Sequence, residues 1–241
     1  MRLVRNSVIA VALALCIPQF ASAQSSKAIL LRAGELYGKK TTVHAVMNMS
    51  MSIGAMGNIA TKSIIYSLGT AKYRVETSML PGPMSARIGT TANSLMVANG
   101  TNIFIYRPAM NQYSVIPESK AIKSGMMMNN PSQSLLSPKG LTSMASSVEG
   151  TATKVTFGNT ACWAIKTRSS MAGQVLTVYV ARANYLIKGV SMTLAMGKMS
   201  MKMNAIFTSM SFPKSLPASL FIFTPPKGAV KVNNAAPMGM P

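Results

Sequence analysis

The sequence lacks the acidic and imidazole side chains on which most hydrolytic enzymes depend. It contains no aspartate, its four acidic residues are all glutamates, and His44 is its only histidine. A hydrolytic triad needs a base with a carboxylate that orients it, and a zinc site needs several His, Cys or acidic ligands. We therefore predict that the chain is not an enzyme and that it holds no metal or cofactor.

Long apolar runs and cysteines are also scarce. The apolar run at residues 8–17 follows two arginines and precedes Ala-Ser-Ala at 21–23, which is the pattern of a cleaved signal peptide. We expect residues 1–23 to be removed on export to the periplasm. Cys162 is then the single cysteine, so an internal disulfide is excluded. No later run approaches the roughly 18 apolar residues of a transmembrane helix.

Negative charge is nearly absent, whereas positive charge is abundant. Lys and Arg number 24 against four acidic residues, which gives a formal net charge of +20. Such an excess favours anionic partners through an attraction that salt screens. Nucleic acid is not expected, because the chain is exported and has no recognition-helix pattern or basic cluster with interleaved aromatic residues. An anionic membrane surface is one candidate partner, and a merely solvated basic surface is the alternative.

Residues 94–115 contain the clearest local pattern. Two apolar runs flank Asn99-Gly100, and the second run ends at Pro108. Asn-Gly accepts the positive φ angles that a tight hairpin turn requires, and proline has no backbone N–H to donate to a neighbouring strand. The segment therefore predicts a β-hairpin whose second strand ends at Pro108.

The spacing of apolar residues predicts one helix and many strands in the rest of the chain. Apolar residues recur every three or four positions at 26–39, as in an amphipathic helix. From residue 43 the period is two, which places Met47, Met49 and Met51 on one face of a strand and His44 on the other. Further strands are expected at 59–68, 72–79, 87–91, 154–157, 162–167, 175–181, 186–196 and 198–210.

Two motifs resemble those of a known family. The hairpin at 94–115, with its Tyr-x-Pro ending, and the block FIFTPPKG at 221–228 are similar to segments of the LolA-like outer-membrane lipoprotein carriers, within the broad LolA, LolB and RseB fold group. The resemblance implies a mainly β (α+β) fold, in which a strongly curved antiparallel sheet forms an incomplete β-barrel and helices cover its concave apolar face. It also implies a single domain over residues 24–231.

Two segments fall outside the regular pattern of that domain. Residues 117–148 are rich in proline, glycine and asparagine, so we expect a loop with short helices. By the resemblance to the family, a segment at this position in the chain covers the cavity as a lid. The candidate lid residues are Met126, Met127, Met128, Leu135 and Leu136. Residues 232–241 are expected to be a disordered tail.

Methionine is unusually frequent, with 22 in the chain. Its side chain is flexible and polarizable, so a sheet face covered with methionines can adapt to partners of varied shape, such as acyl chains. Packing of an ordinary core is the alternative. The candidate cavity residues are Met47, Met49, Met51, Ile64, Tyr66, Val75, Met79, Phe104, Val178, Val180, Met192, Leu194, Met196, Met199, Met201 and Met203.

These patterns together predict a monomeric periplasmic carrier for hydrophobic acyl chains. By the resemblance, the cargo is the acyl groups of lipoproteins, loaded by an inner-membrane releasing complex and received by an outer-membrane acceptor. Two alternatives within the fold group stay open, namely an envelope-stress sensor and a protein that binds lipid or lipopolysaccharide. A structural role on the envelope also stays open. A further alternative is copper(I) binding, because Met-x-Met spacing places soft thioether sulfurs on one face.

Overall fold

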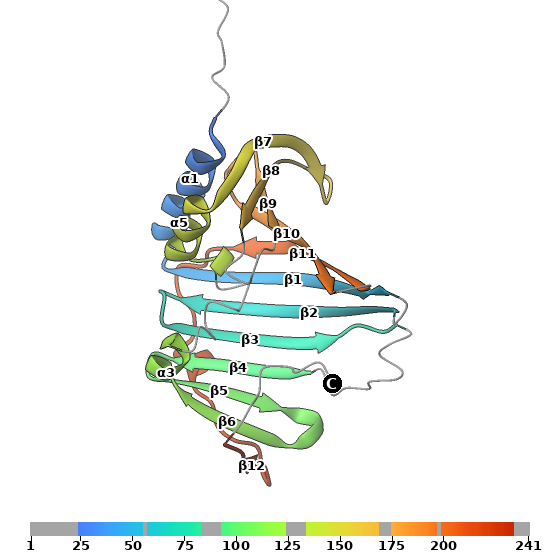
Figure 1. Cartoon of the computed structure of the whole chain (residues 1–241). Helices are drawn as coiled ribbons and strands as arrows, with labels where there is room; N and C mark the ends of the chain where they lie inside the picture. The colour runs from blue at the N-terminus through green and yellow to red at the C-terminus, as the bar shows by residue number, and fades with distance from the viewer. Residues whose placement is uncertain are drawn as a thin grey trace, which may run out of the picture.

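A single sheet of twelve strands dominates the computed structural model, which describes residues 24–54, 57–82, 93–123, 134–168, 175–196 and 199–233 (Figure 1). The predicted signal peptide, the strand predicted at 87–91 and the tail beyond residue 233 lie outside these ranges. The strands are β1 (Thr42–Ile53), β2 (Gly57–Leu68), β3 (Lys72–Met79), β4 (Ser94–Asn99), β5 (Asn102–Arg107), β6 (Gln112–Pro117), β7 (Val148–Phe157), β8 (Thr160–Arg168), β9 (Val175–Ala181), β10 (Ile187–Met196), β11 (Met199–Ser211) and β12 (Val230–Lys231).

The strand order is β12-β6-β5-β4-β3-β2-β1-β11-β10-β9-β8-β7. All neighbours in this order are antiparallel except β12 and β6, which are parallel. The sheet is open, with β7 and β12 as its two edges. In Figure 1, β1 to β6 cross the view side by side, whereas β7 to β9 turn upward, so the sheet is strongly curved. This confirms the predicted fold class.

Helices cover one end of the inner face, which we define as the face that carries Val43 and Ala45 of β1. They are α1 (Ser26–Gly38), α3 (Glu118–Lys123) and α5 (Pro138–Ser146). Helix α1 begins where the Ser25 side chain accepts a hydrogen bond from the N–H of Ala28. Its buried residues, spaced three or four apart, join Val43 and Ala45 in the core. Helices α1 and α5 lie side by side (Figure 1).

The predicted hairpin is confirmed as β4 and β5. The side-chain oxygen of Asn99 accepts hydrogen bonds from the N–H groups of Thr101 and Asn102, and Gly100 has a φ of 93°. Only glycine adopts such an angle without strain. Strand β5 ends at Arg107, and Pro108 begins the 3-10 turn η3 (Pro108–Met110). Proline therefore ends the strand as predicted.

The C-terminal segment covers part of the opposite, outer face. After the 3-10 turn η4 (Ala218–Phe221), the ring of Phe223 lies over Phe104 of β5, with their centroids 5.3 Å apart. Phe221 is buried, and the Arg74 guanidinium donates to the carbonyl oxygen of Leu220 at 3.5 Å. The sheet is therefore buried on both faces near β3 to β5.

Within the described part of the chain, no helix combines the length and the apolar character needed to cross a membrane.

Candidate ligand-binding face

Methionines from three adjacent strands meet on the inner face. Met51 of β1 lies directly opposite Met203 of β11, and Met203 lies directly opposite Met192 of β10. Met47 and Met49 follow on β1 with the same period-two phase, and Met201 follows on β11. We call these six residues, Met47, Met49, Met51, Met192, Met201 and Met203, the methionine face.

Most of the methionine face is buried in this structure. The exposed fractions of Met47, Met192, Met201 and Met203 are between 5% and 9%, while Met49 and Met51 are half-buried. Only Met47 of the buried four belongs to the core beneath α1, and Met49 packs against that core. The methionine face therefore begins at the core and continues beyond it along the strands.

Other predicted cavity residues share the inner face. Val75 of β3 lies opposite Ile65, and Met79 lies opposite Thr61 of β2. Val178 and Val180 of β9 are fully buried in the core. Three more residues continue the register of β10 and β11, with side chains that lie outside the described part. They are Leu194, opposite Met201, and Met196 and Met199, opposite each other.

Three predicted cavity residues lie on the wrong face. Ile64 and Tyr66 alternate with the buried inner-face residue Ile65, and the Tyr66 ring stacks on His44 with centroids 4.7 Å apart. Because successive side chains of a strand point to opposite faces, both residues belong to the outer face. Phe104 is also on the outer face, under Phe223. The prediction of Ile64, Tyr66 and Phe104 as cavity residues was therefore wrong.

The predicted lid is described only in part. Met126, Met127 and Met128 lie outside the described residues. Leu135 is fully buried in the core, and Leu136 packs against it. These two leucines anchor the residues that precede α5 to the core. The role of residues 117–148 as a lid stays a prediction.

Two inner-face residues that flank the methionines are absent from the predicted set of cavity residues. Ile59 of β2 lies opposite Met51, and Leu176 of β9 lies opposite Met192, so they extend the Met51, Met203 and Met192 row at both ends. Their period-two spacing from Ile65 and from Val178 selects them once those two residues are known to point inward. The correct phase of β2 would have selected Ile59 and excluded Ile64.

A buried hydroxyl group lies beside the methionines. Thr61 is opposite both Met49 and Met79, and it is 3% exposed. Its hydroxyl has no hydrogen-bond partner in the described structure, whereas the nearby hydroxyls of Ser63 and Thr77 pair with each other at 3.0 Å. A buried polar group without a partner is costly, and a ligand oxygen would satisfy it.

Tyr37 fixes α1 on the sheet at the closed end of the inner face. Its hydroxyl accepts a hydrogen bond from the N–H of Ile187 at 3.2 Å and donates one to Sδ of Met210. Burial raises the pKa of Tyr37 well above its ordinary value, and the hydrogen bond from Ile187 opposes that shift only in part. The side chain is therefore a neutral structural anchor.

Cys162 is fully buried on the outer side of β8. Burial raises the pKa of its thiol, although Lys188 and the backbone of Phe157 act in the opposite direction. A buried thiol of this kind is a poor nucleophile.

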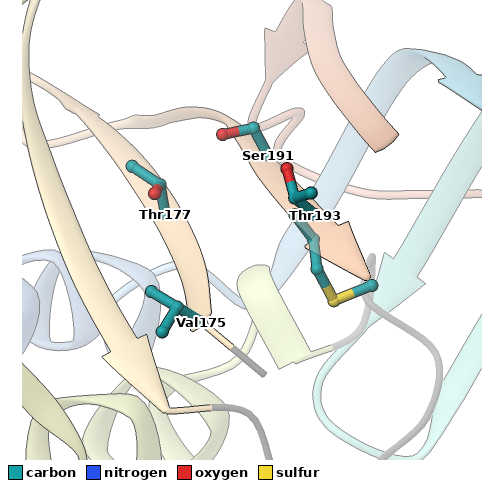
Figure 2. A pocket seen from close by; sticks show the side chains of 5 residues that line it. Val175, Thr177, Ser191 and Thr193 are labelled. Atoms are coloured by element: carbon teal, nitrogen blue, oxygen red, sulfur yellow. The ribbon is translucent and has the colours of Figure 1, made fainter. Parts of the chain in front are cut away.

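A shallow hollow of about 210 Å³ lies between β9 and β10 (Figure 2). Val175 and Thr177 come from β9, Ser191 and Thr193 come from β10, and these four alternate with the inner-face residues of the same strands. Met192 completes the lining. The hollow is therefore a mostly polar feature of the outer face, and Met192 is the one lining residue that it shares with the methionine face.

No group of three or more His, Cys, Asp or Glu side chains suited to a metal ion occurs among the described residues. His44 points away from the methionine face, as the alternation of β1 predicted. The methionine face therefore offers thioether sulfur without the imidazole of His44.

Solved structures resemble this chain in fold. An uncharacterized conserved protein from Thermus thermophilus has a TM-score of 0.51 and 16% identity, over 86% of this chain and 97% of that chain. This likeness shows a shared fold.

Two weaker matches have TM-scores too low to support a functional argument. A putative outer membrane lipoprotein-sorting protein domain from Vibrio parahaemolyticus has a TM-score of 0.38 and 12% identity, over 79% of this chain and 95% of its own. A LolA superfamily protein from Nitrosomonas europaea has a TM-score of 0.40 and 8% identity, over 83% of this chain and 98% of its own.

No curated relative matches the sequence. A family model does match, over residues 83–234, which is more than half of the chain. The predicted export to the periplasm agrees with the description of that family. The chain belongs to the family of predicted periplasmic proteins DUF2092.

Proposed function

We propose that this protein is a periplasmic carrier that holds the acyl chains of lipids or lipoproteins against its methionine face. The observation that carries the proposal is the row of Met51, Met203 and Met192 across three adjacent strands, all on the inner face. The resemblance to lipoprotein carriers in the hairpin and the FIFTPPKG block supports the same class of ligand. Delivery between an inner-membrane releasing complex and an outer-membrane acceptor is part of the proposal.

Methionine suits this role for a physical reason. Its unbranched side chain has three rotatable bonds, so the face can repack around a flexible chain without breaking the sheet. Each acyl methylene that leaves water contributes about 0.8 kcal/mol. Because four of the six methionines are already buried in this structure, an acyl chain must replace contacts that they make, and this lowers the net gain.

The experiment compares two neighbouring residues of β1. Met51→Glu places a charge on the methionine face, whereas Ser50→Glu places the same charge on the exposed outer face of the same strand. We expect Met51→Glu to weaken binding of a fluorescent fatty-acid probe at least tenfold and Ser50→Glu to leave it unchanged. Circular dichroism and the unfolding midpoint show whether both variants fold. Equal binding by the two folded variants would contradict the proposal.

Copper(I) binding is distinguished from acyl binding by a variant that keeps the apolar volume. Met51→Leu with Met203→Leu removes two sulfurs from the row and keeps its hydrocarbon character. An acyl carrier retains probe binding in this double variant. If the face is a copper(I) site, the double variant binds copper(I) more weakly than the wild type in competition with a chromogenic chelator. That result, together with a wild type that binds no acyl probe, would favour the copper function.

A further inference from the structure

The described residues expose three large apolar side chains. Met110 and Val230 lie at the β12 edge of the sheet, and Ile222 precedes Phe223, whose ring packs on β5 and β6 beside that edge. Met110 is 51% exposed, Val230 is 59% exposed and Ile222 is 63% exposed. Single exposed apolar residues are ordinary, but a group on one edge indicates a surface that contacts another apolar phase.

Hydrogen bonds and ring packing connect the three segments that carry these residues to Asn111 and Tyr106. The N–H of Val230 donates to the carbonyl oxygen of Asn111 at 2.9 Å, and Met110 precedes Asn111 in the chain. The hydroxyl of Tyr106 donates to the side-chain oxygen of Asn111 at 3.1 Å. The ring of Phe223, next to Ile222, packs on the same Tyr106 ring at 6.1 Å between centroids.

The scaffold under this edge is rigid. The Phe223 ring is held by three aromatic rings, those of Phe104, Tyr106 and Tyr113. Strand β12 is fixed to β6 by parallel pairing of Val230 with Gln112 and of Lys231 with Tyr113 (Figure 1). The exposed apolar side chains are therefore presented without ordering a loop, which lowers the entropy cost of binding.

Positive charge accompanies the apolar residues. Lys227 and Lys231 are both exposed on the same C-terminal segment. Of the four glutamates, Glu35 and Glu149 lie on α1 and β7, and Glu118 follows the far end of β6. Glu76 lies on β3, further into the sheet, and pairs with Arg74 at 2.6 Å. The edge therefore combines lysines with exposed apolar groups, and the glutamates lie elsewhere.

We propose that this edge, which comprises Met110, Ile222, Lys227, Val230 and Lys231, docks on the surface of an anionic phospholipid membrane. Lysines near the membrane surface attract anionic head groups. The apolar side chains enter the boundary between head groups and acyl chains. This proposal concerns the outer edge and does not depend on acyl binding by the methionine face.

The first test measures sedimentation of the mature protein with vesicles of phosphatidylcholine, with and without phosphatidylglycerol. Lys227→Gln with Lys231→Gln should weaken binding to the anionic vesicles about thirtyfold. Lys166→Gln with Lys202→Gln removes the same charge from exposed positions on β8 and β11 and should change binding less than twofold. Equal losses from the two pairs would mean that only net charge matters, which overturns the proposal.

The second test separates insertion from simple adsorption. Ile222→Cys can be labelled with an environment-sensitive fluorophore, because the native Cys162 is buried. We expect a blue shift of the probe on anionic vesicles and none for a probe at Ser50→Cys on the exposed outer face of β1. An unshifted probe at position 222 on bound protein would overturn the proposal. The variant with both Lys227→Gln and Lys231→Gln should bind the fatty-acid probe as the wild type does. The measurement therefore distinguishes a failure of membrane docking from a failure of acyl binding by the methionine face.

Discussion

The hydroxyl group of Tyr37 in α1 lies 3.1 Å from Sδ of Met210 in β11 and donates a hydrogen bond to it. The same oxygen accepts from the backbone of Ile187 in β10. One side chain therefore joins the first helix to two strands of the second half of the chain. This arrangement leads to the first two predictions.

Replacing Tyr37 by Phe should destabilise the fold by about 1–2 kcal/mol. The substitution preserves the ring but leaves the buried N–H of Ile187 without its acceptor. The free energy of unfolding from urea denaturation measures the effect. Tyr66→Phe is the control, because the Tyr66 ring is only half-buried on the outer face. A loss for Tyr37→Phe no greater than for the control would show that the hydrogen bond contributes nothing.

Stability should fall at alkaline pH because of the same residue. Its pKa is raised in the folded state, so the neutral form is stabilised there. The contribution is complete below the ordinary tyrosine pKa of about 10 and is lost as the pH rises toward the raised value. Urea unfolding above pH 10 should show this decrease in the wild type. The decrease should be smaller in Tyr37→Phe. The prediction would be contradicted if the free energy of unfolding depended on pH in the same way in both proteins.

Two glycines should respond oppositely to alanine. A Cβ atom at Gly189 of β10 would lie 2.1 Å from the carbonyl oxygen of Ala205 and 2.8 Å from Phe157, so Gly189→Ala should destabilise by more than about 2 kcal/mol. A Cβ atom at Gly34 meets Leu141 of α5 at an ordinary 3.6 Å. Gly34→Ala should stabilise α1 by about 0.5–1 kcal/mol. Thermal unfolding of both variants checks the opposite signs.

Thr61→Val should raise the free energy of unfolding by about 1 kcal/mol. The change keeps the shape of the side chain and removes a buried hydroxyl that has no partner in the described structure. If the hydroxyl meets a ligand oxygen, the same variant binds fatty acyl esters more weakly and plain hydrocarbons equally well. Chemical denaturation and competition binding measure the two effects, and an unstable Thr61→Val would mean that the hydroxyl is satisfied.

Cys162 should be unreactive in the native protein. It is fully buried and burial raises its pKa, so the thiolate is scarce at neutral pH. Ellman's reagent should therefore react slowly with the folded mature chain and at the normal rate in denaturant. Rapid reaction under native conditions would show that β8 opens locally.

The sequence predicts which residues of β1 share one face, whereas it does not predict which residues of β2 point to the inner face. In β1, polar residues separate Met47, Met49 and Met51, so only one face can be apolar. In β2, Ile64, Ile65 and Tyr66 are consecutive, and only pairing of Ile65 with Ala45 decides which of them points inward. An uninterrupted apolar run lacks the alternation with polar residues that would indicate which side chains point inward.

Phe104 was misplaced for a related reason. Ile103 and Phe104 are both covered, one by the core and the other by Phe223, so β5 has two apolar faces. Strands buried on both sides have continuous apolar sequences. The contact with Phe223 joins segments that are distant in the chain, and neither segment alone indicates which face it covers.

The position of β1 in the sheet has a consequence for how the exported chain acquires its structure. One neighbour, β2, follows immediately, whereas the other, β11, pairs His44 with Ser211, 167 residues later. Contacts of such long range form slowly. Until β11 has crossed into the periplasm, one side of β1 offers unpaired backbone groups beside a row of apolar side chains, the combination that promotes aggregation. The sheet can therefore be completed only after residues 199–211 have become available for pairing, and until then the first half of the chain carries an incompletely paired strand.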